Sequence, residues 1–303
     1  MDEHRNHRDH QPSTHQPGRH QHGHGHGHGD AGDAAPLAEM LDLDAEVLHS
    51  YLTEVVDWVH GLVKDPSHPR ILDLGTGTGT GALALAQRFP GAEVTALDLS
   101  PELLDRLANK ARALGLAERI RPLQADLDHA WPGLGALDLV WASNSLHHMG
   151  EPDRVLDEVF AAVRPGGLLA VLELDSFPRF LPHDLGLGRP GLEERCHAAL
   201  AAHHQEEVPH LGADWTGNLK RAGFTIEDRR DFTIDLSAPL PEAAGRYAQS
   251  TVRRFRSGLD DRLDADDLAV LDALLTEDGP DSILRRTDLG VRTNRTVWAA
   301  RRP

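Results

Sequence analysis

The length, composition and charge of the chain exclude several classes of protein before any motif is considered. With 303 residues and 40% hydrophobic side chains, the chain can bury the core of one large domain, or of one domain with additions. Its formal net charge of -17 argues against a nucleic-acid partner, because a surface that follows a phosphate backbone needs an excess of lysine and arginine.

Membrane insertion, secretion and disulfide formation are disfavoured by simple features of the sequence. The longest apolar runs, such as Leu168 to Leu172, are far shorter than the ~18 residues that a membrane-spanning helix needs. The N-terminus lacks the apolar core of a signal peptide. Cys196 is the single cysteine, which excludes an intrachain disulfide and a metal site built from several thiolates. We therefore expect an intracellular, cytoplasmic protein that binds no membrane, and the sequence leaves its oligomeric state open.

Residues 1–35 form a histidine-rich tail with almost no apolar side chains, which we expect to be disordered. Its central part alternates histidine with glycine, so that many imidazoles lie on a flexible backbone. Imidazole is a good ligand for Zn²⁺, Ni²⁺ and Cu²⁺, and we expect His22, His24, His26 and His28 to bind such ions loosely, without a catalytic role. A remnant of an expression tag and a drifting tail with incidental affinity are the alternatives.

Residues 36–68 predict a helical cap. Apolar side chains recur at helical spacing through this segment, and Pro66 and Pro69 mark its link to the next element. The pattern predicts two helices, which form this cap.

Residues 71–79 join an apolar strand to a glycine-rich turn and then to a helix. Gly75, Gly77 and Gly79 allow positive φ angles and leave no Cβ to block a ligand, while the helix presents free N–H groups. Such a turn is typical of nucleotide-like ligands. No lysine follows the glycines, so the phosphate-binding loop pattern fails. A dinucleotide pattern can be threaded through Gly77, Gly79 and Ala82, but its first glycine does not follow the strand directly.

Acidic residues close three successive predicted strands. Asp73 lies at the end of the first strand, Asp98 follows the strand at 93–97, and Asp126 closes the strand that begins at Arg121. A carboxylate in the second of these positions can accept hydrogen bonds from both hydroxyls of a ribose, whichever adenosine cofactor carries it. Capping of the following helices is the alternative role. The repetition at successive strand ends favours contact with a ligand.

The alternation of strands and helices continues to the C-terminus. The predicted elements are a strand at 137–144, a loop containing Leu146, His147 and His148, a helix at about 151–163, a strand at 168–174, helices at about 192–207, 214–222 and 241–278, and strands at 232–236 and 293–300.

The ordered set of motifs resembles the class I S-adenosylmethionine-dependent methyltransferases, in particular those of ubiquinone and menaquinone biosynthesis. The glycine-rich turn fits D-x-G-x-G-x-G, and the resemblance is strong over about residues 69–174 and holds in outline beyond them. It implies an α/β, Rossmann-like fold with a seven-stranded, mostly parallel sheet and an antiparallel edge hairpin. The methyltransferase domain would span 69–303, with helical lid insertions at about 175–212 and 237–290.

The resemblance implies S-adenosyl-L-methionine as the cofactor and a cofactor site at the strand ends. Asp98 would bind the ribose hydroxyls, and Asp126 would hold the adenine amino group. The full set expected to bind the cofactor is Asp73, Gly75, Thr76, Gly77, Gly79, Asp98, Leu99, Asp126, Leu127, Ser143 and Asn144.

The expected activity is methyl transfer to an oxygen, nitrogen or carbon of a small-molecule acceptor by direct in-line displacement. This reaction requires alignment and exclusion of water, and a base only where the acceptor is protonated. His147 or His148 could be that base, because imidazole titrates near neutral pH; packing against the cofactor loop is the alternative. A protein that binds the cofactor without turnover and carries a metal-binding tail, and an NAD-dependent oxidoreductase, are the competing functions.

Substrate residues are harder to assign. Tyr247, Arg253 and Arg295 could line a pocket under the lid. An arginine-rich helix usually faces solvent, however, and we assign none of the three to the site.

Overall fold

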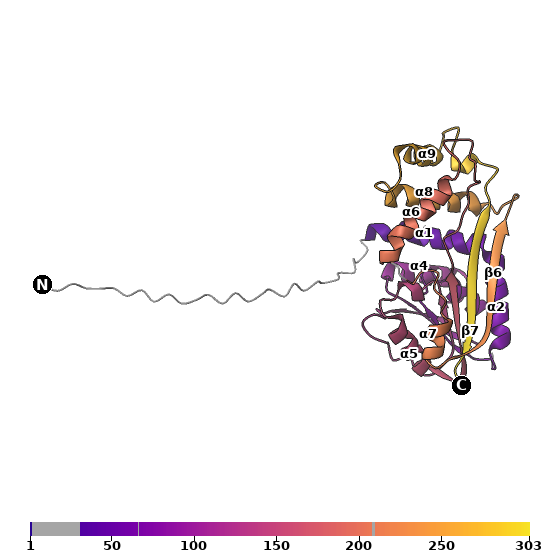
Figure 1. The fold of residues 1–303 in the computed structure, drawn as a ribbon. Coiled ribbons are helices and arrows are strands. Elements are labelled where there is room, and N and C mark those ends of the chain that lie inside the picture. The colour runs from indigo at the N-terminus through magenta and orange to yellow at the C-terminus, as the bar shows by residue number, and fades with distance from the viewer. Residues whose placement is uncertain (2–30, 66, 208–209) are drawn as a thin grey trace.

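The computed structural model describes Met1 and residues 31–65, 67–207 and 210–303 (Figure 1). A seven-stranded sheet runs through the molecule in the order β3-β2-β1-β4-β5-β7-β6. The first five strands pair in parallel, and β7 pairs antiparallel with both β5 and β6. The strands are β1 (Arg70–Leu74), β2 (Glu93–Asp98), β3 (Ile120–Gln124), β4 (Leu137–Ser143), β5 (Val163–Leu174), β6 (Thr225–Leu236) and β7 (Val291–Arg301). The predicted mostly parallel sheet with an antiparallel edge pair is confirmed.

Helices cover both faces of the sheet and one of its ends. They are α1 (Ala31–Val47), α2 (His49–Leu62), α3 (Thr80–Arg88), α4 (Pro101–Ala113), α5 (Pro152–Ala162), α6 (Leu192–Glu207), α7 (Thr216–Arg221), α8 (Ala243–Gly258) and α9 (Ala265–Leu275). Figure 1 shows α1, α6, α8 and α9 together at one end of the sheet. None of the helices in the described ranges is long and apolar enough to cross a membrane.

Alternation along the strands separates two apolar cores. On β1, Ile71 belongs to the core beneath α2, α3 and α4, whereas Leu72 and Leu74 belong to the core beneath α5 and α7. A third apolar cluster joins α1 with α6, α8 and α9, and contains Phe180 and Phe255. This cluster lies beyond the sheet, so the cavity described below has walls from both the sheet and the helical end.

Two strands differ from their sequence-based prediction. Strand β6 begins at Thr225, well before the predicted 232, because its whole length pairs with β7. The residues of β6 alternate between exposed and partly buried, and none of them is fully buried. Strand β5 begins at Val163, earlier than the predicted 168, and its first residues are irregular, with a register shift against β4.

Candidate active site

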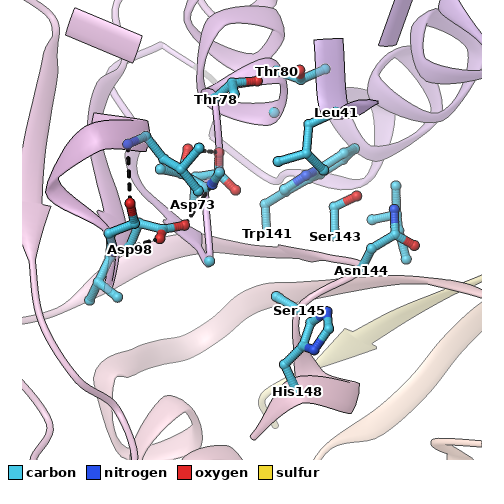
Figure 2. Close-up of a pocket in the computed structure, with 18 of the residues that line it drawn as sticks. Leu41, Asp73, Thr78, Thr80, Asp98, Trp141, Ser143, Asn144, Ser145 and His148 are labelled. Atoms are coloured by element: carbon cyan, nitrogen blue, oxygen red, sulfur yellow. Dashed lines mark hydrogen bonds between the residues drawn. The ribbon is translucent and has the colours of Figure 1, made fainter. Parts of the chain in front are cut away.

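A cavity of about 480 Å³ opens at the carboxyl ends of β1, β2 and β4, with α1 and α2 forming another wall. In parallel α/β sheets this edge is the usual position of ligand sites. Figure 2 shows Asp73 and Asp98 on one side of Trp141, and Ser143 and Asn144 on the other. Ten of the eleven residues predicted to bind the cofactor line this cavity: Asp73, Gly75, Thr76, Gly77, Asp98, Leu99, Asp126, Leu127, Ser143 and Asn144.

The glycines of the turn have two different roles. Gly75 adopts a φ of 69°, and a Cβ at this position would lie 2.5 Å from the Ser145 Cβ, so the turn can approach the β4 loop only without a side chain. Gly79, with a φ of 87°, precedes the first residue of α3, and a Cβ there would collide with Leu107. Gly79 does not line the cavity; its missing side chain makes room for packing against α4.

Asp73 is buried, with an exposed fraction of 2%, and lies at the end of β1. Its Oδ2 accepts a hydrogen bond of 2.6 Å from the Thr76 hydroxyl. Burial raises the pKa of Asp73 to about 6, although the Thr76 hydrogen bond opposes this shift. The charge of this carboxyl group therefore changes close to neutral pH.

Asp98 connects the end of β2 to the glycine turn. Its Oδ2 accepts a hydrogen bond of 2.7 Å from the Gly77 N–H, and its Oδ1 accepts one of 3.0 Å from the Ser100 N–H. Leu99, the next residue, keeps 57% of its surface exposed and lines the same cavity. A fixed carboxylate beside an exposed apolar side chain suits a ligand that carries hydroxyl groups next to a flat ring.

Asp126 lies at the turn after β3 and also lines the cavity. Its Oδ1 accepts a hydrogen bond of 2.9 Å from the Asp128 N–H, and its Oδ2 lies 2.7 Å from His129 Nδ1. Burial tends to raise the pKa of Asp126, but these hydrogen bonds outweigh it and leave the pKa below the usual value. The carboxylate thus caps the turn after β3 while its residue lines the cavity.

The two adjacent histidines of the β4 loop have different environments. His147 is buried, and its Nδ1 lies 2.5 Å from Glu173 Oε2. The other Glu173 oxygen accepts the Leu146 N–H at 3.1 Å. Because a carboxylate can only accept, Nδ1 of His147 carries the hydrogen. His147 does not line the cavity, whereas His148 does, and the two rings lie 4.1 Å apart between centroids.

Glu173 was not singled out from the sequence. The available signal was an acidic residue near the end of the apolar run of β5, at a position buried from solvent. A charged side chain at such a position needs a partner, and here the partners come from the loop after β4.

A second group of polar residues lies at the helical end of the cavity; two of them, Tyr247 and Arg295, were considered from the sequence, whereas Asp44 was missed. Arg295 on β7 is 3% exposed, and its Nη2 donates to Asp44 Oδ1 at 2.8 Å. The Tyr247 hydroxyl donates to the same oxygen at 2.6 Å. Burial opposes the charge of Arg295, but Asp44 and its neighbours outweigh this, so the pKa of the guanidinium is above its usual value. Arg295 and Asp44 line the cavity, so the expectation that Arg295 faces solvent is wrong.

Helix α1 is fastened to the cofactor side of the cavity as well. Asp42 accepts a hydrogen bond of 2.6 Å from the Thr78 hydroxyl and one of 2.8 Å from Arg106 Nε, and it also pairs with Lys110. Asp42 therefore ties α1 to the glycine turn and α4, while Asp44 ties it to β7 and α8. Together the two aspartates hold α1 across the cavity.

The lining has the features that an adenosine cofactor with a cationic end requires. Three buried polar atoms of the lining, Trp141 Nε1, Ser145 Oγ and Arg295 Nε, have no hydrogen-bond partner among the described residues. Asp98 and the exposed Leu99 match a ribose and a base, and Asp73 places a carboxyl group beside the glycine turn. The residues that line the cavity therefore fit an adenosine cofactor with a cationic end.

Comparison with known proteins identifies the family. A model described as a methyltransferase domain matches residues 71–167. The demethylmenaquinone methyltransferase of Thermus thermophilus is 34% identical over 183 residues, which cover 60% of this chain and 73% of that protein. The chain belongs to the class I S-adenosylmethionine-dependent methyltransferases. The trans-aconitate 2-methyltransferase of Paracidovorax citrulli is 39% identical over 102 residues, covering 33% of this methyltransferase and 37% of that protein.

Solved structures agree on the fold of this methyltransferase. A putative methyltransferase from Bacillus halodurans aligns with a TM-score of 0.51 at 16% identity, covering 82% of this chain and 98% of that one. The [4+2]-cyclase SpnF aligns with a TM-score of 0.50 at 23% identity, covering 83% and 80%. Since a cyclase shares the fold, the fold by itself does not fix the acceptor or the reaction.

The predicted metal ligands of the tail, His22, His24, His26 and His28, lie outside the described residues. Within the part of the chain that the structure describes, no three histidine, cysteine or acidic side chains are grouped to hold a metal ion.

Proposed function

We propose that this methyltransferase transfers the methyl group of S-adenosylmethionine to an oxygen, nitrogen or carbon atom of a small apolar acceptor. The observation that carries this proposal is the continuity of the cavity, which extends from the glycine turn and Asp98 to Asn144, His148 and Arg295. When bound, the cofactor supplies a methyl group on a positively charged sulfur, ready for in-line displacement. Relatives named as demethylmenaquinone and trans-aconitate methyltransferases support a small-molecule acceptor.

The chain's own residues bind the two reactants and exclude water. In this proposal Asp98 holds the ribose hydroxyls, Leu99 packs against the base, and Asp126 lies where the adenine amino group would bind. Asp42 and Asp44 hold α1 across the site, which keeps water from the reacting atoms. Asn144 adopts a φ of 50° at the end of β4, with its N–H donating to the Leu172 carbonyl at 2.8 Å.

A base is needed only for an acceptor that loses a proton. Of the two predicted histidines, His148 lines the cavity, and we assign it this role: an imidazole nitrogen takes the proton as the acceptor is methylated. His147 then acts as a support, because its ring is held by Glu173 outside the cavity lining.

Ligand-dependent stability of the full chain tests the cofactor assignment. With a metal chelator present, we expect S-adenosylmethionine and S-adenosylhomocysteine to raise the unfolding midpoint, since a ligand at ~100 times its Kd adds about 2.7 kcal/mol. NAD should leave the midpoint unchanged. Stabilisation by NAD, and none by the other two, would reject a methyltransferase and favour an oxidoreductase. Transfer of a labelled methyl group to members of an acceptor panel then separates an enzyme from a binding protein.

The raised pKa of Asp73 predicts that cofactor affinity depends on pH. Above about pH 6 the carboxyl is ionised and stabilises the positive charges of S-adenosylmethionine, so we expect the affinity to increase about tenfold from about pH 5 to about pH 7. Titration calorimetry of wild type and Asp73→Asn measures this, and the variant should bind weakly with no such dependence. A wild-type affinity that is constant over this range contradicts the assignment.

The raised pKa of Asp73 makes the stability of the ligand-free protein change with pH in the opposite direction to cofactor affinity. The folded chain holds the Asp73 proton more tightly than the unfolded chain, whose carboxyl pKa is near 3.8. The contribution of Asp73 to stability is therefore greatest at low pH and is lost as the pH rises through about 6.

A further inference from the structure

The acceptor end of the cavity contains a charged pair within apolar walls. Arg295 comes from β7 and Asp44 from α1, 251 positions apart in the chain, and their side chains meet at 2.8 Å. The cavity lining also includes Leu41, Leu48, Tyr51 and Leu172. The pair and the apolar side chains therefore line one cavity.

Arg295 also retains an unused hydrogen-bond donor. Its Nη2 is paired with Asp44 and its Nη1 lies 3.3 Å from Asn144 Oδ1, but Nε has no hydrogen-bond partner among the described residues. A buried donor without a partner costs free energy, which a ligand can recover by supplying an acceptor atom. Arg295 lines the cavity although only 3% of its surface is exposed to solvent. The residue with the unpartnered donor therefore borders a space large enough for a ligand.

We propose that Asp44 and Arg295 recognise a hydroxyl group of the methyl acceptor, which is therefore an apolar compound bearing a hydroxyl, such as a phenol or enol. The proposal rests on the function proposed above and names the acceptor class of the same site. A hydroxyl donates one hydrogen bond, to the Asp44 carboxylate, and accepts another, from the Arg295 guanidinium. A single neutral hydroxyl can therefore satisfy both members of the pair.

Other acceptor groups match the pair less well. A carboxylate would pair with Arg295 but would be repelled by Asp44, which is fixed in place by the Tyr247 hydroxyl at 2.6 Å. An ammonium group would pair with Asp44 but would face the charge of Arg295. An ether can accept a hydrogen bond but has none to donate. The geometry thus discriminates by hydrogen bonding more than by net charge.

The first test uses the wild-type full chain saturated with S-adenosylhomocysteine. Its probes are naphthol, methoxynaphthalene, naphthoate and aminomethylnaphthalene, which share the naphthalene ring and carry a hydroxyl, an ether, a carboxylate and an ammonium group. We expect naphthol to bind at least about tenfold more tightly than each of the other three, the increment of one hydrogen bond to a charged group. Equal binding of naphthol and its ether, or tightest binding of naphthoate or of aminomethylnaphthalene, overturns the proposal.

Substitutions of Arg295 and Asp44 distinguish recognition of the acceptor hydroxyl from a purely structural contact between α1 and β7. Arg295→Lys keeps the charge but loses the fork of donors, and Asp44→Asn keeps the shape but loses the charge. Each should reduce the preference for naphthol over methoxynaphthalene by about tenfold, with KM for hydroxylated acceptors changing more than kcat. Arg121→Gln, at an exposed position on β3, is the matched control and should leave the preference unchanged.

The outcomes distinguish this proposal from the one on which it rests. A structural tie predicts a lower melting temperature in both variants with an unchanged ratio of naphthol to methoxynaphthalene affinity, and this result would reject recognition by the pair. Where a variant does not fold, the wild-type probe series still decides. Failure of S-adenosylmethionine to bind the wild-type protein would instead reject the proposed function.

Discussion

Replacing Asp98 with alanine is expected to weaken the binding of S-adenosylmethionine about 100-fold, or by about 3 kcal/mol. The substitution removes the acceptor for the ribose hydroxyls in the proposed site. It also leaves the N–H groups of Gly77 and Ser100 without their carboxylate partner, so that the glycine turn loses one of its hydrogen bonds to β2. Isothermal titration of the folded variant measures the change in Kd.

Two further variants test whether the loss of affinity in Asp98→Ala is specific to this carboxylate. Asp98→Asn retains one carbonyl oxygen and should lose about tenfold, because one of the two accepting positions survives. Asp105→Ala, on the exposed face of α4, removes an acid close by in sequence and should bind the cofactor as the wild type does. An unchanged Kd for Asp98→Ala would contradict the ribose assignment. A loss of equal size in Asp105→Ala would point to net charge rather than contact.

The cofactor half of the cavity could be predicted from the sequence because its residues are specified locally. Gly75, Gly77 and Asp98 each follow the end of a short apolar strand, and parallel strands bring their carboxyl ends to one edge. The order of strands along the chain then places the turn and the acids around one cavity. The antiparallel pair of β6 and β7 was implied by the resemblance to the methyltransferases, but not the full length of β6, which depends on pairing with β7 rather than on its own apolar pattern.

The acceptor half could not be predicted in the same way, because it is built from contacts between distant segments. Asp44 belongs to α1, Arg295 to β7 and Tyr247 to α8, and only the folded lid brings them together. One local signal was available: Thr293, Arg295 and Val297 alternate on the buried face of β7. An arginine at an inward strand position indicates a buried partner, whereas the many other arginines of the C-terminal part favour a solvent-exposed position.

The two adjacent histidines of the β4 loop have different positions in the structure. From the sequence, His147 and His148 are equivalent candidates for a base. In the structure His147 is hydrogen-bonded to Glu173, whereas His148 lines the cavity. The difference arises from the short helical turn after β4, which directs neighbouring side chains to different sides. Glu173 therefore organises the loop on which both Asn144 and His148 depend.

Replacing Glu173 with leucine is accordingly expected to destabilise the fold by about 3 kcal/mol, measured by urea unfolding of the ligand-free protein. The substitution leaves the His147 Nδ1–H and the Leu146 N–H buried without an acceptor, and leucine supplies no polar atom in exchange. Glu118→Leu, an exposed position, is the matched control and should change the free energy of unfolding by less than about 0.5 kcal/mol.

The glutamine variant separates hydrogen bonding from charge at the same position. Glu173→Gln keeps a carbonyl oxygen for one of the two donors, so it should cost clearly less than the leucine variant, about 1–2 kcal/mol. If leucine and glutamine cost the same, the charge of Glu173 rather than its two accepted hydrogen bonds would be what stabilises the loop. If neither variant differs from the Glu118 control, then Glu173 does not hold the β4 loop, and the separation of roles between His147 and His148 would need another cause.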